Sequence, residues 1–162
     1  MIYSNSEIRR QDRVLDEQPA LNLLKTGEYG VLSMHCVESG VYSVPINYVW
    51  DGDKSIYLRC APEGRKLRCL EKDNAVSFCI VGRTNVISEK FTTEYESIIL
   101  ECRAYRNLPA VERMNALAFI LDKYSPDDKA SGLKYAEKSF NRTEIIRLEI
   151  KNWSGKCKNT VK

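Results

Sequence analysis

The sequence has 162 residues, 43% hydrophobic and 29% charged, and its formal net charge is +3. These values fit one globular domain with a substantial core and exclude a disordered chain. The sequence has no concentrated basic patch interleaved with aromatic residues, which argues against nucleic-acid binding. The start lacks a secretory-type apolar segment and no stretch is long enough to span a bilayer, so we expect a soluble, cytoplasmic protein without a membrane partner.

The first part of the chain predicts one helix followed by a series of strands. Residues 1–13 are polar and predict a surface arm, and the leucines that follow predict a helix over 16–25 that Gly27 ends. Pro45 indicates an edge strand or a bulge, and the polar residues 51–54 predict a hairpin turn. The strands predicted in this part are 29–36, 41–50 and 55–60.

The middle of the chain predicts a short helix after Gly64 and then further strands. Leu67 and Leu70 give that helix one buried face. The near-continuous apolar run over 75–82 predicts a central strand, and another strand is predicted over 94–105. The segment between these strands, 83–93, is expected to be irregular.

The last part of the chain predicts two helices and a final strand. Pro109 fits the first turn of a helix, and residues 125–128 break the helical pattern before a second helix that ends near Lys138. The final strand is predicted over 143–150, with Trp153 just beyond it. Hairpin connections require antiparallel pairing, so this order of elements predicts a single domain, 1–162, built as a small barrel with helices outside.

The six cysteines and the single histidine do not suggest a metal site. The cysteines are Cys36, Cys60, Cys69, Cys79, Cys102 and Cys157. None forms a Cys-x-x-Cys pair, and His35 has no partner at ligand spacing. Without a signal peptide we also expect no disulfide framework, and Cys79 and Cys102 are interpreted as small buried side chains in strands. A reactive thiol at Cys60 is left open.

Gly64, Arg65 and Lys66 could hold an anion, because they stand where a strand gives way to a helix. Free amides at a helix start and two cations suit a phosphate. From the spacing alone, an ordinary loop with solvated charges is the better explanation. The sequence has no nucleophile and base at a recognisable spacing, so an enzyme of this sequence would need a cofactor for its chemistry.

Several segments, taken in order, resemble one protein family. They are GEYGVLS (27–33), VPINYVWDGD (44–53), CAPEGRKL (60–67), VSFCIVG (76–82), EKFTTEYES (89–97) and KYSPD (123–127). Over residues 9–157 the chain resembles the nitroimidazole-resistance (Nim-type) flavoproteins of the pyridoxamine 5′-phosphate oxidase-like superfamily. The resemblance implies a mainly β fold with added helices, namely an FMN-binding split β-barrel with antiparallel, Greek-key-like strands. It also implies a homodimer with flavin at the subunit interface.

The resemblance further implies a set of flavin contacts. Arg65 and Lys66 match residues that hold the flavin phosphate, and Cys60 and Gly64 lie on the same turn. The backbone of one strand is implied to run along the isoalloxazine ring, at Val44, Pro45, Ile46 and Asn47. Three further positions are implied to lie near the flavin: Ser97, which reaches it from the partner chain, Trp153 and Lys156.

Arg59 departs from the family pattern. Many Nim-type proteins have a histidine at this position, and arginine cannot lose its proton and act as a general base. Arg59 could instead bind an anionic substrate or a second phosphate, such as the adenylate side of FAD.

Three functions follow as hypotheses. The first is an FMN- or FAD-dependent oxidoreductase, nitroreductase-like or related to pyridoxamine 5′-phosphate oxidase, that passes electrons from an external donor to a small acceptor such as a nitroaromatic. The second is a flavin-binding carrier or sensor without turnover, which the loss of the histidine at Arg59 favours. The third is a haem-binding relative, for which His35 is a poor axial ligand.

Overall fold

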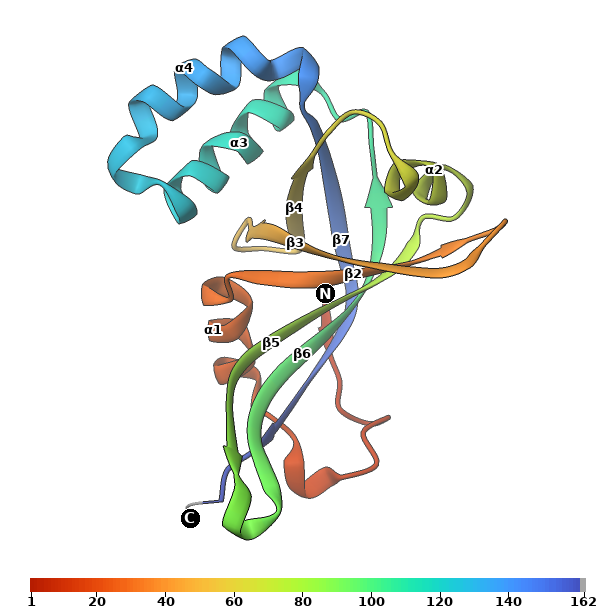
Figure 1. Cartoon of the computed structure of the whole chain (residues 1–162), viewed down its shortest axis with the longest axis vertical. Helices are drawn as coiled ribbons and strands as arrows, with labels where there is room; N and C mark the ends of the chain where they lie inside the picture. Colours follow the sequence, from red (N-terminus) through yellow and green to blue (C-terminus); the bar gives the residue numbers. More distant parts are fainter. Residues whose placement is uncertain (161–162) are drawn as a thin grey trace.

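Six strands close into a ring in the computed structural model of the chain, which describes residues 1–160 (Figure 1). These described residues form seven strands in all, which are β1 (Ile2–Tyr3), β2 (Tyr29–Cys36), β3 (Gly40–Trp50), β4 (Ser55–Cys60), β5 (Ala75–Ile87), β6 (Thr92–Tyr105) and β7 (Glu144–Lys158). The ring runs β7-β4-β3-β2-β5-β6 and closes because β6 also pairs with β7. All of its pairs are antiparallel, and β1 adds to β7 in parallel. The predicted mainly β, split-barrel fold is confirmed.

The helices cover different parts of this ring. They are α1 (Glu17–Thr26), α2 (Arg65–Lys72), α3 (Ala110–Tyr124) and α4 (Lys129–Ser139). Short 3-10 helices occur at Gln11–Arg13, Ser88–Lys90, Pro126–Asp128 and Phe140–Arg142. In Figure 1, α3 and α4 form a helical hairpin beside β3 and β4, while α2 lies at the end of the barrel where β5 begins.

The main core fills the barrel because the strands alternate between buried and exposed residues. In β6, for example, Ile98, Leu100, Cys102 and Ala104 are buried and the residues between them are exposed. A second, smaller core lies outside the barrel, where α3 and α4 cover Val49, Tyr57 and Ile145. The second core fixes the helical hairpin against the outer face of β3, β4 and β7.

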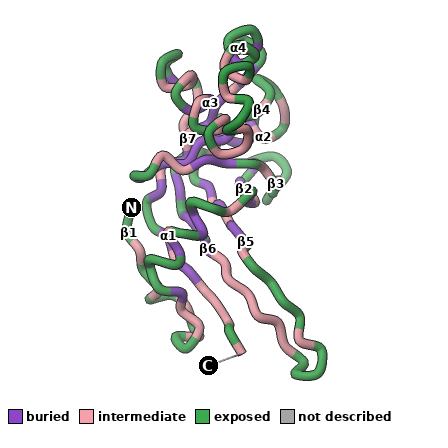
Figure 2. Tube along the Cα trace, turned by 90° about the vertical axis from the view of Figure 1, so that its left-hand side faces the viewer, coloured by how far each residue is buried: buried purple, intermediate pink, exposed green. Residues whose placement is uncertain are grey.

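The β5–β6 hairpin extends beyond the barrel as an arm, which the sequence did not predict. Residues 83–93 were expected to be irregular, but β5 continues to Ile87 and β6 begins at Thr92, with a register shift between Val81 and Thr84. Figure 2 shows that the arm is exposed or only partly buried along its length. Because neither face of the arm packs on the core, its residues carry no apolar alternation, and that alternation is the signal that predicts a strand.

Both ends of the chain also differ from the prediction. The last strand does not end near residue 150. It continues to Lys158 because β7 pairs with β6 from Arg147 to Lys158. Trp153 therefore lies within β7 and not beyond it. The predicted surface arm at residues 1–13 contains β1, and the ring of Tyr3 packs on Trp153 with their centroids 4.5 Å apart.

The expectation of no disulfide is wrong, since Cys36 and Cys69 are bonded. Cys102 is buried as predicted, whereas Cys79 is only half-buried. Within residues 1–160 no helix is long and apolar enough to cross a bilayer, and no group of histidine, cysteine and acidic side chains gathers as metal ligands would.

Candidate functional site

The barrel is split where β3 and β4 part from each other. The two strands pair only through Tyr48–Trp50 of β3. Residues 40–47 of β3 pair with β2 along one edge, and no described strand pairs with the other edge. Beyond Leu58, Arg59 and Cys60 of β4 pair only with β7. Backbone donors and acceptors along one edge of β3 are therefore free to bind a ligand.

A cavity of about 480 Å³ lies in this split. One wall is the β3 segment that the sequence singled out, contributed by Pro45, Ile46 and Asn47. The other wall comes from α3 and the residue after it, through Ile120, Leu121, Tyr124 and Ser125, and Arg59 of β4 also lines the cavity. A free strand edge facing two aliphatic side chains suits a flat, partly polar ligand. Val44 is half-buried against the barrel core and is not among the residues that line this cavity.

The C-terminal end of α3 is fastened to the barrel at the mouth of the cavity. The hydroxyl of Tyr124 lies 2.6 Å from the carbonyl of Glu28 and 2.7 Å from that of Tyr48. It also accepts the amide of Tyr48 at 3.1 Å. The ammonium of Lys123 donates to the carbonyls of Gly27 and Tyr48. These contacts set the distance between the two walls.

Substitution of Tyr124 by phenylalanine is expected to lower the free energy of unfolding by about 1–3 kcal/mol. The change removes the hydroxyl that accepts the Tyr48 amide and leaves that amide without this partner. Urea denaturation of both proteins measures the difference. Tyr135→Phe is the matched control, because that tyrosine is exposed and its hydroxyl makes no hydrogen bond within residues 1–160. Equal losses in the two variants would contradict a role of Tyr124 in fastening α3.

The turn between β4 and α2 depends on Gly64. Its φ of 134° and ψ of 171° lie in a region that only glycine adopts readily. Gly64 is the N-cap of α2, and its carbonyl accepts the amide of Arg68 at 3.2 Å. The glycine thus turns the chain so that the first amides of α2, at Arg65 and Lys66, are left free of intrahelical partners.

Gly64→Ala is expected to cost about 1–3 kcal/mol of stability. The reason is backbone conformation alone, since a Cβ at this position meets no atom within 4 Å. Glu63→Ala, in the same exposed turn, should change stability by less than about 0.5 kcal/mol. Thermal unfolding of both variants gives the comparison, and a neutral Gly64→Ala would show that the turn tolerates another conformation.

Arg65 and Lys66 begin α2 side by side but have different surroundings. The guanidinium of Arg65 donates to the hydroxyl of Ser39 at 3.0 Å and lies 4.1 Å from the centre of the Tyr42 ring. Lys66 is half-buried and lies beside Cys60. Burial raises the pKa of the Cys60 thiol, although the positive charge of Lys66 acts in the opposite direction. Cys60 is therefore a neutral thiol on this turn and not an activated nucleophile.

Arg59 borders three neighbouring cavities between the barrel and the α3–α4 hairpin. Besides the cavity along β3, one is lined by α3 and α4, and one by Cys60, Arg142 and Thr143. The guanidinium of Arg59 is exposed and forms no ion pair within residues 1–160. A fixed positive charge without a counter-charge is thus available at the centre of the cleft.

Comparison with protein families decides where the chain belongs. A family model described as pyridoxamine 5′-phosphate oxidase matches residues 16–157. The match runs from the residue before α1 almost to the end of β7, and so it includes the split and the α2 turn. The chain belongs to the pyridoxamine 5′-phosphate oxidase family. Among curated proteins, no sequence matches the chain.

Solved structures with this fold come from several bacteria. A candidate 5-nitroimidazole antibiotic resistance protein from Bacteroides thetaiotaomicron superposes with a TM-score of 0.72 at 17% identity, over 90% of this chain and 86% of that one. An FAD-binding protein from Mesorhizobium loti gives a TM-score of 0.66 at 18% identity, over 91% and 98%. An FAD and heme binding protein from Mycobacterium smegmatis gives 0.68 at 17% identity, over 89% and 72%. At these identities the likeness is one of fold.

Three residues that the resemblance places near a flavin do not line the β3 cleft of their own chain. Ser97 and Lys156 face each other across β6 and β7, and Ser97 also pairs with Val81 near the start of the arm. In Figure 1, α2 lies beside the opposite end of β5. Trp153 is only 2% exposed and packs in the barrel core against Tyr3, so it has almost no surface for a ligand.

The sequence did not single out the α3 wall of the cleft. Tyr124 falls inside the KYSPD segment on which the family resemblance rested, which was the one available signal. Ile120 and Leu121 continue an ordinary amphipathic helix, and such a pattern does not distinguish a residue facing the core from one facing a cavity. Ser39, the partner of Arg65, lies in the β2–β3 turn and had no distinguishing motif.

Proposed function

We propose that the protein binds a flavin, FMN or FAD, in the split between β3 and β4 and acts as a Nim-type oxidoreductase. The observation that carries the proposal is the free edge of β3, which borders a cavity at residues 45–47 and leads to Tyr42, whose ring centre lies 4.1 Å from the guanidinium of Arg65 at the start of α2. Family membership supports it, as do the FAD-binding proteins of the same fold from Mesorhizobium loti and Mycobacterium smegmatis.

The residues present suit the two ends of a flavin. An isoalloxazine ring has polar edges and apolar faces, and the outer edge of β3 at Pro45, Ile46 and Asn47, which no described strand pairs with, lies opposite Ile120 and Leu121 and offers both kinds of contact. Proline has no amide hydrogen, so at Pro45 the edge can offer only an acceptor. The phosphate end requires cations and free amides, which the start of α2 provides.

The bound flavin would supply the redox chemistry, taking electrons from an external donor and passing them to a small acceptor such as a nitroaromatic. The chain's own residues bind and orient it. The α3 wall, fastened by Tyr124, covers one side of the cleft. Arg65 and Lys66 neutralise the phosphate, and Arg59 provides a positive charge for an anionic group in the cleft.

The proposal includes a homodimer with flavin at the subunit interface. Ser97 and Lys156 lie away from the α2 turn of their own chain, so they could reach a flavin only in a neighbouring copy. Exposed apolar side chains on β5 and β6, including Val81, Val86 and Ile99, and Phe91 in the turn between the two strands, support a partner at this face. Sedimentation velocity of the purified protein tests the assembly.

A flavin carrier or sensor without turnover is the second candidate. The favouring observation is that Arg59 and Tyr124 are the only titratable side chains on the β3 cleft within the described chain. Burial raises the pKa of Tyr124 further above neutrality, and arginine keeps its proton. Neither group can act as a general base near pH 7.

The deciding experiment is the visible spectrum of the purified protein with mass spectrometry of the released ligand. Flavin absorption bands with the mass of FMN or FAD are the expected result. A colourless protein that also fails to bind added FMN would overturn the proposal. Steady-state consumption of NAD(P)H with a nitroimidazole, measured above the free-flavin background, then separates the oxidoreductase from the carrier.

A further inference from the structure

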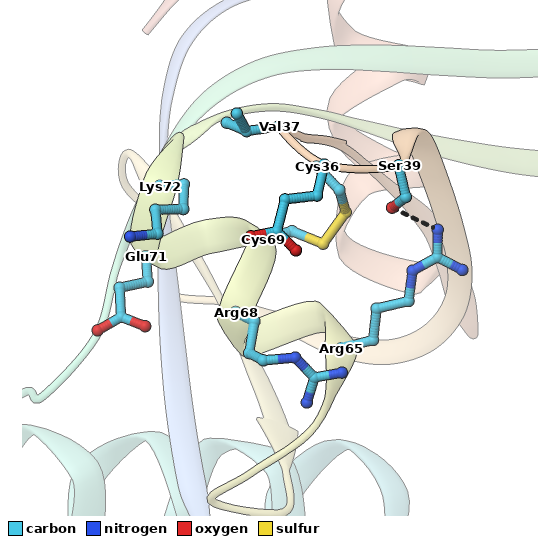
Figure 3. Close-up of a pocket in the computed structure, with 9 residues that line it drawn as sticks. Cys36, Val37, Ser39, Arg65, Arg68, Cys69, Glu71 and Lys72 are labelled. Carbon is cyan, nitrogen blue, oxygen red and sulfur yellow. Dashed lines mark hydrogen bonds between the residues drawn. A yellow bond between two sulfur atoms is a disulfide. The ribbon is translucent and has the colours of Figure 1, made fainter.

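The Cys36–Cys69 disulfide lies in the wall of a cavity of its own (Figure 3). Cys36 is the last residue of β2, and Cys69 lies in the second half of α2. Both residues line a cavity of about 390 Å³, together with the turn after β2. The bond is therefore shielded from most directions, yet it borders a space large enough for a small molecule to enter.

The cavity wall is rich in cations. Arg65, Arg68 and Lys72 project from α2, and two carboxylates, Glu38 and Glu71, also line the space. Figure 3 shows Arg65 and Ser39 on one side of the disulfide, with Glu71 and Lys72 on the other. None of these charged groups forms an ion pair within residues 1–160. The three unpaired cations would attract an anion toward the sulfur atoms.

We propose that Cys36–Cys69 is a thiol–disulfide exchange site for a small anionic thiol. A thiolate attacks one sulfur, the S–S bond breaks, a mixed disulfide forms, and the released cysteine thiolate takes a proton from solvent. A second small thiolate then attacks the mixed disulfide at the sulfur of the small thiol. Two small thiols are thereby oxidised to their disulfide, and the two cysteines are reduced to thiols. Neighbouring cations favour the thiolate that each step requires or releases.

Reduction would loosen α2, because the disulfide is its one covalent link to β2. The remaining contacts include the buried side chains of Leu67 and Leu70 and a hydrogen bond from Arg106 to the carbonyl of Leu67. Just after α2, the carboxylate of Asp73 lies 3.7 Å from Nδ1 of His35 in β2. The Arg65–Ser39 hydrogen bond spans the same gap as the disulfide. Because α2 carries Arg65 and Lys66, its order would also set the affinity for a flavin phosphate, a consequence that rests on the proposed function.

The exchange is tested by reducing the native protein with glutathione, which is anionic, and with 2-mercaptoethanol, which is neutral. Alkylation with iodoacetamide at timed intervals, followed by mass spectrometry, gives both rates. The R68Q/K72Q variant removes two charges from the wall without touching the sulfurs. We expect the ratio of the glutathione rate to the 2-mercaptoethanol rate to fall about fivefold in this variant. A ratio that stays the same, or a native disulfide that glutathione does not reduce, would overturn the proposal.

The effect on α2 has a readout that needs no flavin. Amide hydrogen exchange at Arg68 and Asp73, whose amides bond to the carbonyls of Gly64 and Cys69, should accelerate when the protein is reduced. The C36S/C69S variant should exchange at the faster rate in either condition, and the amides of α1 should not change. FMN titrations of both redox states follow, with riboflavin as the control that lacks a phosphate. If FMN binds neither state, the proposed flavin function fails while the exchange result stands.

Discussion

Replacement of both Arg65 and Lys66 by alanine is expected to weaken FMN binding by about 10²–10⁴-fold. Each cation would make a charge-assisted hydrogen bond to the phosphate, and losing two such bonds gives a change of this size. Arg65 is exposed and Lys66 is half-buried, so neither contributes to the barrel core. Fluorescence quenching during titration of the flavin-free protein measures the affinity.

Two comparisons separate loss of the phosphate site from general damage. Arg68→Ala/Lys72→Ala removes two charges from the same helix but leaves the turn at Gly64 intact, and it should keep FMN affinity within about threefold. Riboflavin has no phosphate, so its affinity should be nearly equal in all three proteins. Full FMN retention by Arg65→Ala/Lys66→Ala would show that the phosphate lies elsewhere.

Removal of the Cys36–Cys69 disulfide is expected to lower the free energy of unfolding by about 3–4 kcal/mol. The bond joins residues 33 positions apart, and closing a loop of this length restricts the unfolded chain by about that amount. The variant Cys36→Ala/Cys69→Ala should therefore unfold at clearly lower urea concentration than the oxidised protein. The loss is a large share of the total stability of an ordinary domain.

A reducing agent supplies the control for this prediction. Dithiothreitol should destabilise the wild type and leave Cys36→Ala/Cys69→Ala unchanged, because the four other cysteines are free. Cys102 in particular is buried, and burial raises the pKa of its thiol to about 12, so it does not form the reactive thiolate near neutral pH. If dithiothreitol does not change the urea midpoint of the wild type, the disulfide contributes nothing to stability.

The sequence predicted those strands whose apolar residues face a core. The bounds of β2 and β4 agree with the prediction residue for residue, because each has a clear apolar pattern and ends in turn residues. The arm was not predicted, because residues 83–93 do not pack against the core and therefore lack an apolar pattern. The extension of β7 was not predicted because Ser154 and Gly155 resemble a turn, and only pairing with the long strand β6 keeps them extended.

The site was predictable where it rests on local chain chemistry and not where it rests on tertiary contacts. Gly64 and the cations after it form a recognisable turn, and the structure has that turn at the start of α2. The interior position of Trp153 depends on a register shift between Glu101 and Cys102, which no local pattern encodes. The disulfide depends on which two of six cysteines approach each other, and spacing alone could not reveal that pairing.

The position of β7 in the ring has a consequence for how the protein is made. This strand pairs with β4 on one side and β6 on the other, so it is the element that closes the barrel. During synthesis the edges of β4 and β6 remain bare until residues 144–158 have left the ribosome. The β6–β7 pairing also joins residues about fifty positions apart, as at Glu101 and Asn152, and such distant pairing is slow. Nascent chains stalled before Glu144 should therefore be open sheets that need chaperone protection.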